Sequence, residues 1–401
     1  MAKVRLALVG CGNISRNHIR GMRDLHERGC DWFEVTACVD PVAANAERAA
    51  GEIGQFQKNA PAVCASVKEL VSRGLAEAAD LCLPHCFHHN VAIECLEGGL
   101  HVMVEKPLGL TIRASRAIIA AAKRAGKVLA TGENIRRYRT SRACAWALTQ
   151  KKLVGEVRAV DIVHLNHSPL NPAEPLWKWR AIKALTGGGM IMDSGAHTSD
   201  MLVHMFGEPE TVYCRMSTLS AITVDDAPVL GRATLDVEDE WHVVINFKNG
   251  VRFTWTSSRV CPCEDRRHGR YYGSRGIMTD KGFVMHPFQG GGEAVTEDGT
   301  VTSEQIEEQY LASLSQSERE HLFPFGSTDG FAIEVADFVR AVATGGSPEM
   351  DGEAGLRSKA MSIACYESAT RGEIVRYDDV LAGRITDYQD PLDKFWKIPG
   401  A

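Results

Sequence analysis

The sequence predicts an α/β protein in which a parallel sheet with helices on both faces is followed by a region that contains an antiparallel sheet. Two observations support this fold class. In the first part of the chain, short apolar runs alternate with helix-like segments, as they do in βαβ units. Beyond about residue 150, runs that alternate polar and apolar residues at period two take over. A length of 401 residues suits two to three domains of about 150 residues each.

The composition narrows the class of protein. Hydrophobic residues make up 44% and charged residues 24%, which is typical of globular proteins and excludes a disordered, collagen-like or membrane-embedded chain. A net charge of −6 argues against a nucleic-acid partner. No apolar run resembles an export signal or approaches the roughly 18 residues of a membrane span. The 12 cysteines lack the paired spacing of a zinc site, so we expect a cytoplasmic protein with reduced thiols.

The elements of the first part follow in order. Strands are expected at Val4 to Val9, Val35 to Val39, Ala79 to Leu83, Val102 to Glu105 and Val128 to Thr131. Helices are expected at Ile14 to Arg28, Val91 to Glu97 and Ile112 to Ala125. Because helices separate the strands, the sheet is expected to be parallel.

The later part has a different pattern. Residues 241 to 255 form two alternating runs on either side of Asn249-Gly250, which predicts a hairpin with a tight type I′ turn. Helices are expected at Phe331 to Ala343 and Gly355 to Thr370, where apolar residues recur at i, i+3, i+4 and i+7. Residues 261 to 329 have no legible pattern and are interpreted as a mobile insertion.

A glycine turn follows the first strand and begins a helix. It reads Gly10-Cys11-Gly12-Asn13-Ile14-Ser15, with serine in place of a third glycine. Gly10 permits a tight turn, and Gly12 lets a pyrophosphate approach the backbone amides at the start of the helix. The context predicts a dinucleotide site formed by Gly10, Gly12, Asn13 and Ile14.

Two more motifs lie at the ends of predicted strands. Asp40 ends the second strand, where a carboxylate accepts hydrogen bonds from ribose hydroxyls and repels a 2′-phosphate, so NAD is favoured over NADP. The alternative is an ordinary turn aspartate.

Glu105-Lys106-Pro107 ends a later strand, where ligands bind open α/β sheets. Taken alone, it could be a surface ion pair followed by a turn proline.

A glycine-rich segment in the second part of the chain precedes a candidate catalytic helix. Gly187-Gly188-Gly189 leads to Asp193 and His197, which lie four residues apart and share one helix face. His204 lies seven residues further on, but the spacing of the three matches no standard zinc motif, so no metal is predicted. A helix cap at Asp193 beside a core histidine is the structural alternative.

These motifs, together with Leu83-Pro84-His85-Cys86-Phe87-His88, resemble the Gfo/Idh/MocA oxidoreductases in order and spacing. The resemblance implies a Rossmann domain, here residues 1–130, and an α/β domain, residues 131–401, with a large, mostly antiparallel open sheet that binds substrate and mediates homo-oligomers, either dimers or tetramers. It implies a catalytic set of Lys106, Asp193 and His197. Cofactor-lining positions are Pro84, His88, Glu105, Lys106, Asn134 and Arg180. Substrate-binding positions are Lys106, Tyr138, Trp179, Asp193 and His197.

The expected reaction is NAD-dependent hydride transfer at a secondary hydroxyl of a sugar, polyol or glycoside, with C3 of a glucoside as the specific prediction. Histidine titrates near neutrality whereas lysine stays charged, so His197 is assigned as acid/base and Lys106 as the cation that polarises the substrate oxygen. Asp193 would hold the imidazole or a hydroxyl in register. Alternatives are an enzyme with retained, internally cycling NAD, for glycoside cleavage or sugar-to-sugar exchange, and a catalytically silent NAD or sugar sensor.

Overall fold

The computed structural model describes residues 3–171, 173–283 and 285–398. Its contacts divide the chain into two compact units. The first contains Met1–Leu110, Ala114–Arg137 and Gln316–Leu356. The second contains Thr111–Arg113, Tyr138–Ser315 and Arg357–Ala401. Each unit is therefore assembled from segments that are distant in the sequence.

The first unit contains a six-stranded parallel sheet in the order β3-β2-β1-β4-β5-β6. The strands are β1 Val4–Val9, β2 Phe33–Val39, β3 Ala62–Cys64, β4 Ala78–Leu81, β5 His101–Glu105 and β6 Leu129–Gly132. This confirms the predicted Rossmann sheet. The chain runs outward from β1 in both directions, so the switch point, where ligands bind in such sheets, lies at the carboxyl end of β1.

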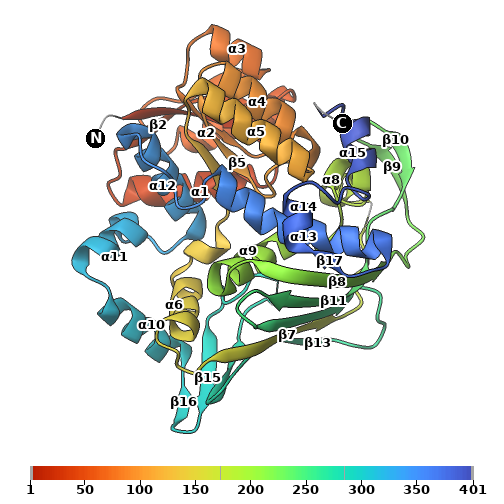
Figure 1. The fold of residues 1–401 in the computed structure, drawn as a ribbon. Helices are drawn as coiled ribbons and strands as arrows, with labels where there is room; N and C mark the ends of the chain where they lie inside the picture. Colours follow the sequence, from red (N-terminus) through yellow and green to blue (C-terminus); the bar gives the residue numbers. More distant parts are fainter. Residues whose placement is uncertain (1–2, 172, 284, 399–401) are drawn as a thin grey trace. The chain divides into compact units, whose positions relative to one another are not determined.

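Helices of the first unit flank this sheet, and one of them comes from late in the sequence. They are α1 Ser15–Glu27, α2 Ala43–Ile53, α3 Val67–Ser72, α4 His88–Glu97, α5 Ile112–Ala125, α11 Gln316–Leu322 and α12 Gly330–Thr344, with 3₁₀ turns at His85–Phe87, Ile135–Arg137 and Pro324–Gly326. Figure 1 shows α12 beside α1. A Cβ at Gly21 would lie 2.6 Å from the backbone nitrogen of Ala332, so glycine is what permits this close packing.

The second unit contains a nine-stranded sheet in the order β16-β15-β14-β13-β7-β12-β11-β8-β17. Its strands are β7 Val157–Leu165, β8 Pro209–Ser217, β11 Glu240–Phe247, β12 Arg252–Ser258, β13 Arg266–Gly273, β14 Gly276–Asp280, β15 Gly292–Thr296, β16 Gly299–Val301 and β17 Val375–Arg376. Only the pair of β12 and β7 is parallel among these described strands, which confirms a large, mostly antiparallel sheet.

Further elements complete this unit. A separate two-stranded sheet pairs β9 Thr223–Ala227 with β10 Gly231–Thr234. The helices are α6 Arg139–Thr149, α7 Pro175–Lys178, α8 Lys183–Thr186, α9 Gly195–Phe206, α10 Ser303–Ser313, α14 Tyr377–Leu381 and α15 Asp390–Phe395, while α13 Gly352–Arg371 begins in the first unit and continues into the second. No helix of the described part of the chain combines the length and apolar character needed to cross a membrane.

The hairpin of β11 and β12 is confirmed, but its predicted turn type is wrong. Gly250 has φ +90°, whereas Asn249 is not among the residues with positive φ, as a type I′ turn would require. The Asn249 side chain accepts a hydrogen bond from the Val251 amide, and the Phe247 amide bonds to the Val251 carbonyl. The connection is therefore longer than a two-residue turn.

The interpretation of residues 261–329 as a mobile insertion is also wrong. This stretch supplies β13 to β16 and α10, and β13 pairs along its whole length with β7. The strands are short and interrupted by glycines, and β7 lies about 100 residues earlier in the chain. Pairing over that separation leaves no local signal that periodicity can detect.

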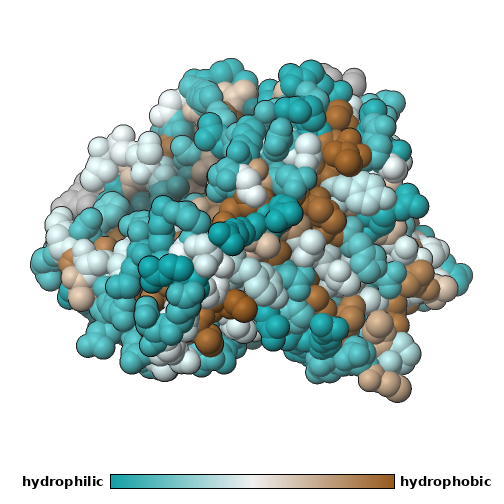
Figure 2. Space-filling view, turned by 60° about the horizontal axis from the view of Figure 1, so that its bottom comes forward, coloured by the Kyte–Doolittle hydropathy of each residue, from teal (hydrophilic) through white to brown (hydrophobic). Residues whose placement is uncertain are grey.

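The nine-stranded sheet packs one face inward and leaves the other exposed. Trp241 and Trp255 are buried with ring centroids 5.3 Å apart, and Gly195 at the start of α9 lies against Trp255. Tyr213 and Val244 pair across β8 and β11 on the exposed face. On the side of the molecule in Figure 2, hydrophobic groups form separate patches among hydrophilic ones. Patches of this kind are ordinary on a protein surface.

Candidate active site

The glycine turn lies at the switch point of the parallel sheet. Gly10 has φ +86°, and a Cβ there would lie 2.4 Å from the Cys82 carbonyl oxygen. A Cβ on Gly12 would meet no heavy atom within 4 Å, so that face of the turn is open. Helix α1 has no side-chain cap at its N-terminus, and the Ser15 hydroxyl donates back to the Gly12 carbonyl. Open backbone before an uncapped helix suits a pyrophosphate.

Asp40 follows β2 at the same edge of the sheet. Its Oδ2 accepts the Cys11 amide at 2.8 Å, and its Oδ1 accepts the Val42 amide at 2.8 Å. Oδ1 also accepts a longer hydrogen bond, 3.4 Å, from the Asn45 side-chain amide. The carboxylate therefore has a fixed orientation beside the glycine turn, and Oδ2 retains a lone pair. Arg48, from α2, donates to the Cys11 carbonyl and pairs with Glu52, so a cation also lies against the turn.

Two loops at this edge carry Pro84 and Lys106, and a histidine joins them. Pro84 precedes the 3₁₀ turn after β4, and half-buried Lys106 follows β5 with a cis peptide bond to Pro107. The His88 ring nitrogens lie 2.9 Å from the Pro107 carbonyl oxygen and 2.8 Å from that of Leu83. His88 was predicted as a cofactor-lining residue, and in the structure its ring braces the loop that carries Lys106.

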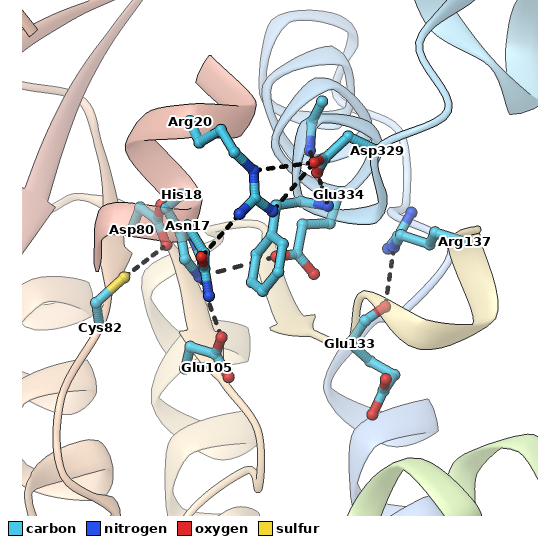
Figure 3. A network of polar contacts seen from close by, with 12 residues as sticks. Asn17, His18, Arg20, Asp80, Cys82, Glu105, Glu133, Arg137, Asp329 and Glu334 are labelled. Carbon is cyan, nitrogen blue, oxygen red and sulfur yellow. Dashed lines mark hydrogen bonds and ion pairs between the residues drawn. The ribbon is translucent and has the colours of Figure 1, made fainter. Parts of the chain in front are cut away.

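A buried polar network lies beneath this edge (Figure 3). His18 of α1 places Nδ1 2.8 Å from Asp80 and Nε2 3.1 Å from Glu105. Glu334 of α12 lies 3.8 Å from the same Nε2, and neither of its carboxyl oxygens has a hydrogen-bond partner among the residues that the structure describes. Burial is the largest single influence on His18 and lowers its pKa, but Asp80 and Cys82 together outweigh it, so the pKa lies well above the ordinary value. Burial and the nearby Glu105 carboxylate raise the pKa of Glu334, although His18 opposes them.

The segment after β6 belongs to the same edge. Asn134 is buried, and its carbonyl accepts the Arg137 amide. Arg137 is buried too, and its guanidinium bonds to Asp337 at 3.1 Å and to the Glu133 carbonyl at 3.2 Å. These contacts fix the backbone around Asn134. Tyr138, the next residue along the chain, belongs to the second unit and is the N-cap residue of α6.

In the second unit, two of the three consecutive glycines, Gly188 and Gly189, are required by close packing. A Cβ on Gly188 would lie 2.3 Å from the Tyr366 ring, and one on Gly189 would lie 2.8 Å from the Glu238 carboxyl. Glu238 is fully buried and accepts the Gly189 amide, the Ile191 amide and the Tyr366 hydroxyl. Burial raises the pKa of Glu238 even though these donors lower it. The buried Glu238 carboxyl therefore holds the loop that leads to Asp193.

Asp193 and His197 lie beyond this loop. Asp193 accepts a 2.7 Å hydrogen bond from Arg180 Nε, and the Arg180 guanidinium lies 4.2 Å from the ring centroid of Trp179. Helix α9 has Ser194 at its N-cap, and that side chain forms no capping hydrogen bond. His197 is buried and meets the His286 ring edge-on at 5.0 Å, whereas His204 on the same helix is exposed.

The structure gathers the predicted site residues into two groups. The sheet edge of the first unit contains Gly10, Gly12, Asn13, Ile14, Asp40, Pro84, His88, Glu105, Lys106 and Asn134. The second unit contains Tyr138, Trp179, Arg180, Asp193 and His197. Sequence reasoning missed the supporting residues His18, Glu238 and Tyr366, because nothing in a local pattern distinguishes a buried charged partner from a surface one.

Family models match both the N-terminal part and a later part of the chain. The model of an oxidoreductase family with an NAD-binding Rossmann fold matches residues 4–133, and the GFO/IDH/MocA C-terminal domain model matches residues 144–279. The chain belongs to the Gfo/Idh/MocA oxidoreductase family. It is thus an oxidoreductase with an NAD-binding Rossmann domain, which confirms the predicted enzyme class.

Several relatives are dehydrogenases or reductases of sugars. A 1,5-anhydro-D-fructose reductase of Ensifer adhaerens is 25% identical over 77% of this chain and 82% of its own. A D-glucoside 3-dehydrogenase of Escherichia coli is 29% identical over 43% of this chain and 49% of its own. An oxidoreductase of Agrobacterium radiobacter, solved with NAD⁺, L-tartaric acid and magnesium, has a TM-score of 0.72 at 17% identity, covering 94% of this chain and 99% of its own. The last likeness concerns the fold alone.

Proposed function

We propose that this protein is an NAD-dependent dehydrogenase that transfers hydride between the nicotinamide and a secondary hydroxyl of a sugar, polyol or glycoside, with C3 of a glucoside as the specific position. The family membership and the sugar-active relatives support the reaction class. The observation that carries the proposal is the open glycine turn before an uncapped helix, beside the fixed Asp40 carboxylate.

NAD is proposed over NADP because Asp40 holds a negative charge where the 2′-phosphate of NADP would lie. Its oxygens are oriented by the Cys11 and Val42 amides and can accept ribose hydroxyls as well. Gly10, Gly12, Asn13 and Ile14 would hold the pyrophosphate, and Pro84, His88, Glu105, Asn134 and Arg180 are proposed as further cofactor-lining residues. When bound, NAD accepts the hydride.

Lys106, Asp193 and His197 are proposed as the catalytic residues. Oxidation of an alcohol needs a base for the hydroxyl proton and a group that stabilises the negative charge developing on oxygen. His197 takes the proton, and the Lys106 ammonium polarises the oxygen. Asp193, held by Arg180 at 2.7 Å, orients a substrate hydroxyl or the imidazole. Tyr138 and Trp179 are proposed to bind the sugar, and Trp179 offers an apolar ring face for it.

A substrate-panel assay with NAD and NADP tests this proposal. We expect absorbance at 340 nm to rise with at least one sugar, polyol or glycoside, with NAD preferred, and product analysis to locate one new carbonyl. Product that forms without net NADH, together with NAD that copurifies, would identify the retained-cofactor mechanism instead. A protein that binds NAD but oxidises nothing in the panel would be the sensor.

The surroundings and assembly of the protein complete the proposal. Its 12 cysteines are all free thiols, and we propose that the protein lies in the cytoplasm, where thiols stay reduced.

We also propose a homo-oligomer, a dimer or tetramer, formed through the exposed face of the nine-stranded sheet. Tyr213, Val244, Ile277 and Val295 are exposed apolar residues of these strands. Size-exclusion chromatography with light scattering measures the number of subunits.

A further inference from the structure

A cavity within the second unit lies next to Asp193. Its charged and aromatic lining residues come from three places in the fold, of which one is the segment of Asp193 itself. Glu238, Asp239 and Arg259 lie at one end of the nine-stranded sheet, just before β11 and just after β12. Trp177 and Arg180 come from the segment around α7, ahead of the three glycines. The cavity is therefore continuous with the residues proposed to act on substrate.

The acids in this lining already have partners. Glu238 accepts two backbone amides and the Tyr366 hydroxyl. Asp239 accepts the Leu219 and Ser220 amides, each at 2.8 Å. Asp193 is paired with Arg180. Arg259 Nη1 forms a hydrogen bond with none of these carboxylates in the described part of the chain.

The Arg259 guanidinium lines this cavity and is left with an unsatisfied donor. Its side chain is buried, with the residue 8% exposed, and its Nη1 has no hydrogen-bond partner among the described residues. Its Nη2 lies 3.4 Å from the Ser168 hydroxyl, a weak contact, and the guanidinium lies over the Trp177 ring, 5.3 Å from the centroid. Burial lowers the pKa of this guanidinium, although the Asp239 and Asp193 charges oppose that shift.

A buried guanidinium that lacks a hydrogen-bonded anion is unfavourable, because its N–H groups have left water without gaining a full set of acceptors. A ligand anion that enters the cavity would supply them. Guanidinium and carboxylate are both planar, and their paired donors and acceptors match. The neighbouring acids disfavour a doubly charged group more than a singly charged one, so a carboxylate suits this place better than a phosphate.

We propose that Arg259 binds the carboxylate of an acidic sugar, such as a uronic or aldonic acid, and so sets the substrate class of the enzyme. This inference rests on the proposed function, because it assumes that Asp193 addresses the same substrate. Arg259 lies in the unit that carries Asp193 and His197. The acid group would lie over the Trp177 ring while the carbinol carbon lies toward Asp193.

The test compares neutral sugars with the matching acids: glucose with glucuronate, galactose with galacturonate, and mannose with mannuronate. Binding to the NAD-loaded protein is measured by calorimetry, and turnover by NADH formation. A hydrogen-bonded ion pair of this kind is worth about 10- to 100-fold in affinity. We expect at least one acid to bind that much more tightly than its neutral partner, and its preference in kcat/KM to be mainly a lower KM.

Arg259→Met should reduce the ratio of the affinity for the acid to that for the neutral sugar to within about threefold of one. Arg259→Lys should give an intermediate ratio, because lysine keeps the positive charge but lacks the paired N–H donors of a guanidinium. Arg252→Met is the matched control, since Arg252 is exposed on β12 and its loss removes the same charge outside the cavity. Far-UV circular dichroism checks folding, and Arg259→Lys serves if Arg259→Met does not fold.

The outcomes separate this inference from the proposed function. Acids that bind in an Arg259-dependent way without being oxidised would support the anion site and contradict the dehydrogenase. Neutral sugars that are oxidised as well as their acids would leave the dehydrogenase intact and overturn the anion site. Absence of Arg259-dependent acid binding overturns it too, as does a preference for glucose 6-phosphate over glucuronate.

Discussion

His197 is the residue whose role is most directly testable. It lies buried in the first turn of α9. The loop just before this helix is held by the Glu238 carboxylate, so the position of His197 is well determined within its unit. Positioned proton transfer contributes about 100- to 10,000-fold to rate. We expect His197→Ala to lower kcat by that order while the Kd for NADH, measured by fluorescence titration, changes little.

The control for this change is His204→Ala, which alters an exposed histidine of the same helix. It should keep turnover within about twofold of the wild type, since surface substitutions rarely perturb a fold. A His197→Ala protein that turns over substrate at the normal rate would remove the residue from the mechanism and leave Lys106 as the candidate acid/base.

Asp40 determines the cofactor preference in this proposal. Asp40→Ser removes the negative charge and the acceptors for the ribose hydroxyls, so the affinity for NAD should fall by about 10- to 100-fold. The affinity for NADP should fall much less or rise. The ratio of kcat/KM for the two cofactors measures the change.

Asp31→Ser is a suitable comparison, because Asp31 is exposed in the same unit. It should leave the cofactor ratio unchanged. Because Asp40 also accepts the Cys11 amide, the melting temperature of Asp40→Ser should be recorded alongside. A ratio that stays at the wild-type value would mean that Asp40 only shapes the turn.

The glycine loop is the element that joins packing to the proposed chemistry. Gly188 has φ +153°, and its missing side chain leaves room for the Tyr366 ring. Gly188→Ala therefore forces either the loop or the ring to move. We expect it to destabilise the protein by about 1–3 kcal/mol in chemical denaturation and to lower kcat, because the loop leads to Asp193.

Gly231→Ala separates backbone strain from packing. Gly231 also has positive φ, +70°, but a Cβ there would meet no heavy atom within 4 Å. It should be destabilised less than Gly188→Ala and keep its activity. Equal effects of the two substitutions would show that the Tyr366 contact is unimportant.

Elements were predictable where the pattern is local. The strand at Val4–Val9 and the helix at Ile112–Ala125 have the predicted bounds, because apolar runs and helical periodicity are visible in short windows. The strands between residues 261 and 301 could not be predicted from local patterns. The first of them, β13, pairs with β7, which is remote in the sequence. The turn at Asn249-Gly250 was predicted in place but not in type.

The candidate site was predictable to the same degree. Asp40, Lys106 and His197 stand out because they follow strands or glycines at fixed spacing. The residues that support them do not. His18 appears in the sequence as one polar residue of an amphipathic helix, and only the fold brings Asp80, Glu105 and Glu334 around it. Likewise, no pattern in the neighbouring sequence indicates that the Arg259 guanidinium is buried with an unpartnered nitrogen.

At the scale of the whole molecule, the division of the chain differs from a simple order of domains. The predicted boundary at residue 130 falls within β6, the last strand of the parallel sheet along the chain, and α12 packs on α1 in the first unit. Helix α12 brings Glu334 and Asp337 against His18 and Arg137. Unfolding of this unit must therefore expose charged groups from both ends of the sequence together.

This burial predicts how stability depends on pH. The pKa of His18 is raised above its ordinary 6.5, so its contribution is complete below that value and is lost as pH rises through the folded pKa. The pKa of Glu334 is raised above its ordinary 4.5, so this carboxyl keeps its proton to a higher pH in the folded state than in the unfolded chain. Both groups make the folded state bind more protons, so the free energy of unfolding should decrease as pH rises above about 4.5.

Glu334→Gln isolates the carboxyl part of this effect. The amide has nearly the same shape but does not titrate, so the fall in melting temperature from pH 5 to pH 8 should be smaller than in the wild type, by roughly a few degrees. The His18 part should remain. Glu47→Gln, on the exposed side of α2 in the same unit, should reproduce the wild-type slope. If calorimetry gives Glu334→Gln that same slope, the Glu334 carboxyl is already ionised in the folded protein, and its proximity to His18 is an ordinary ion pair.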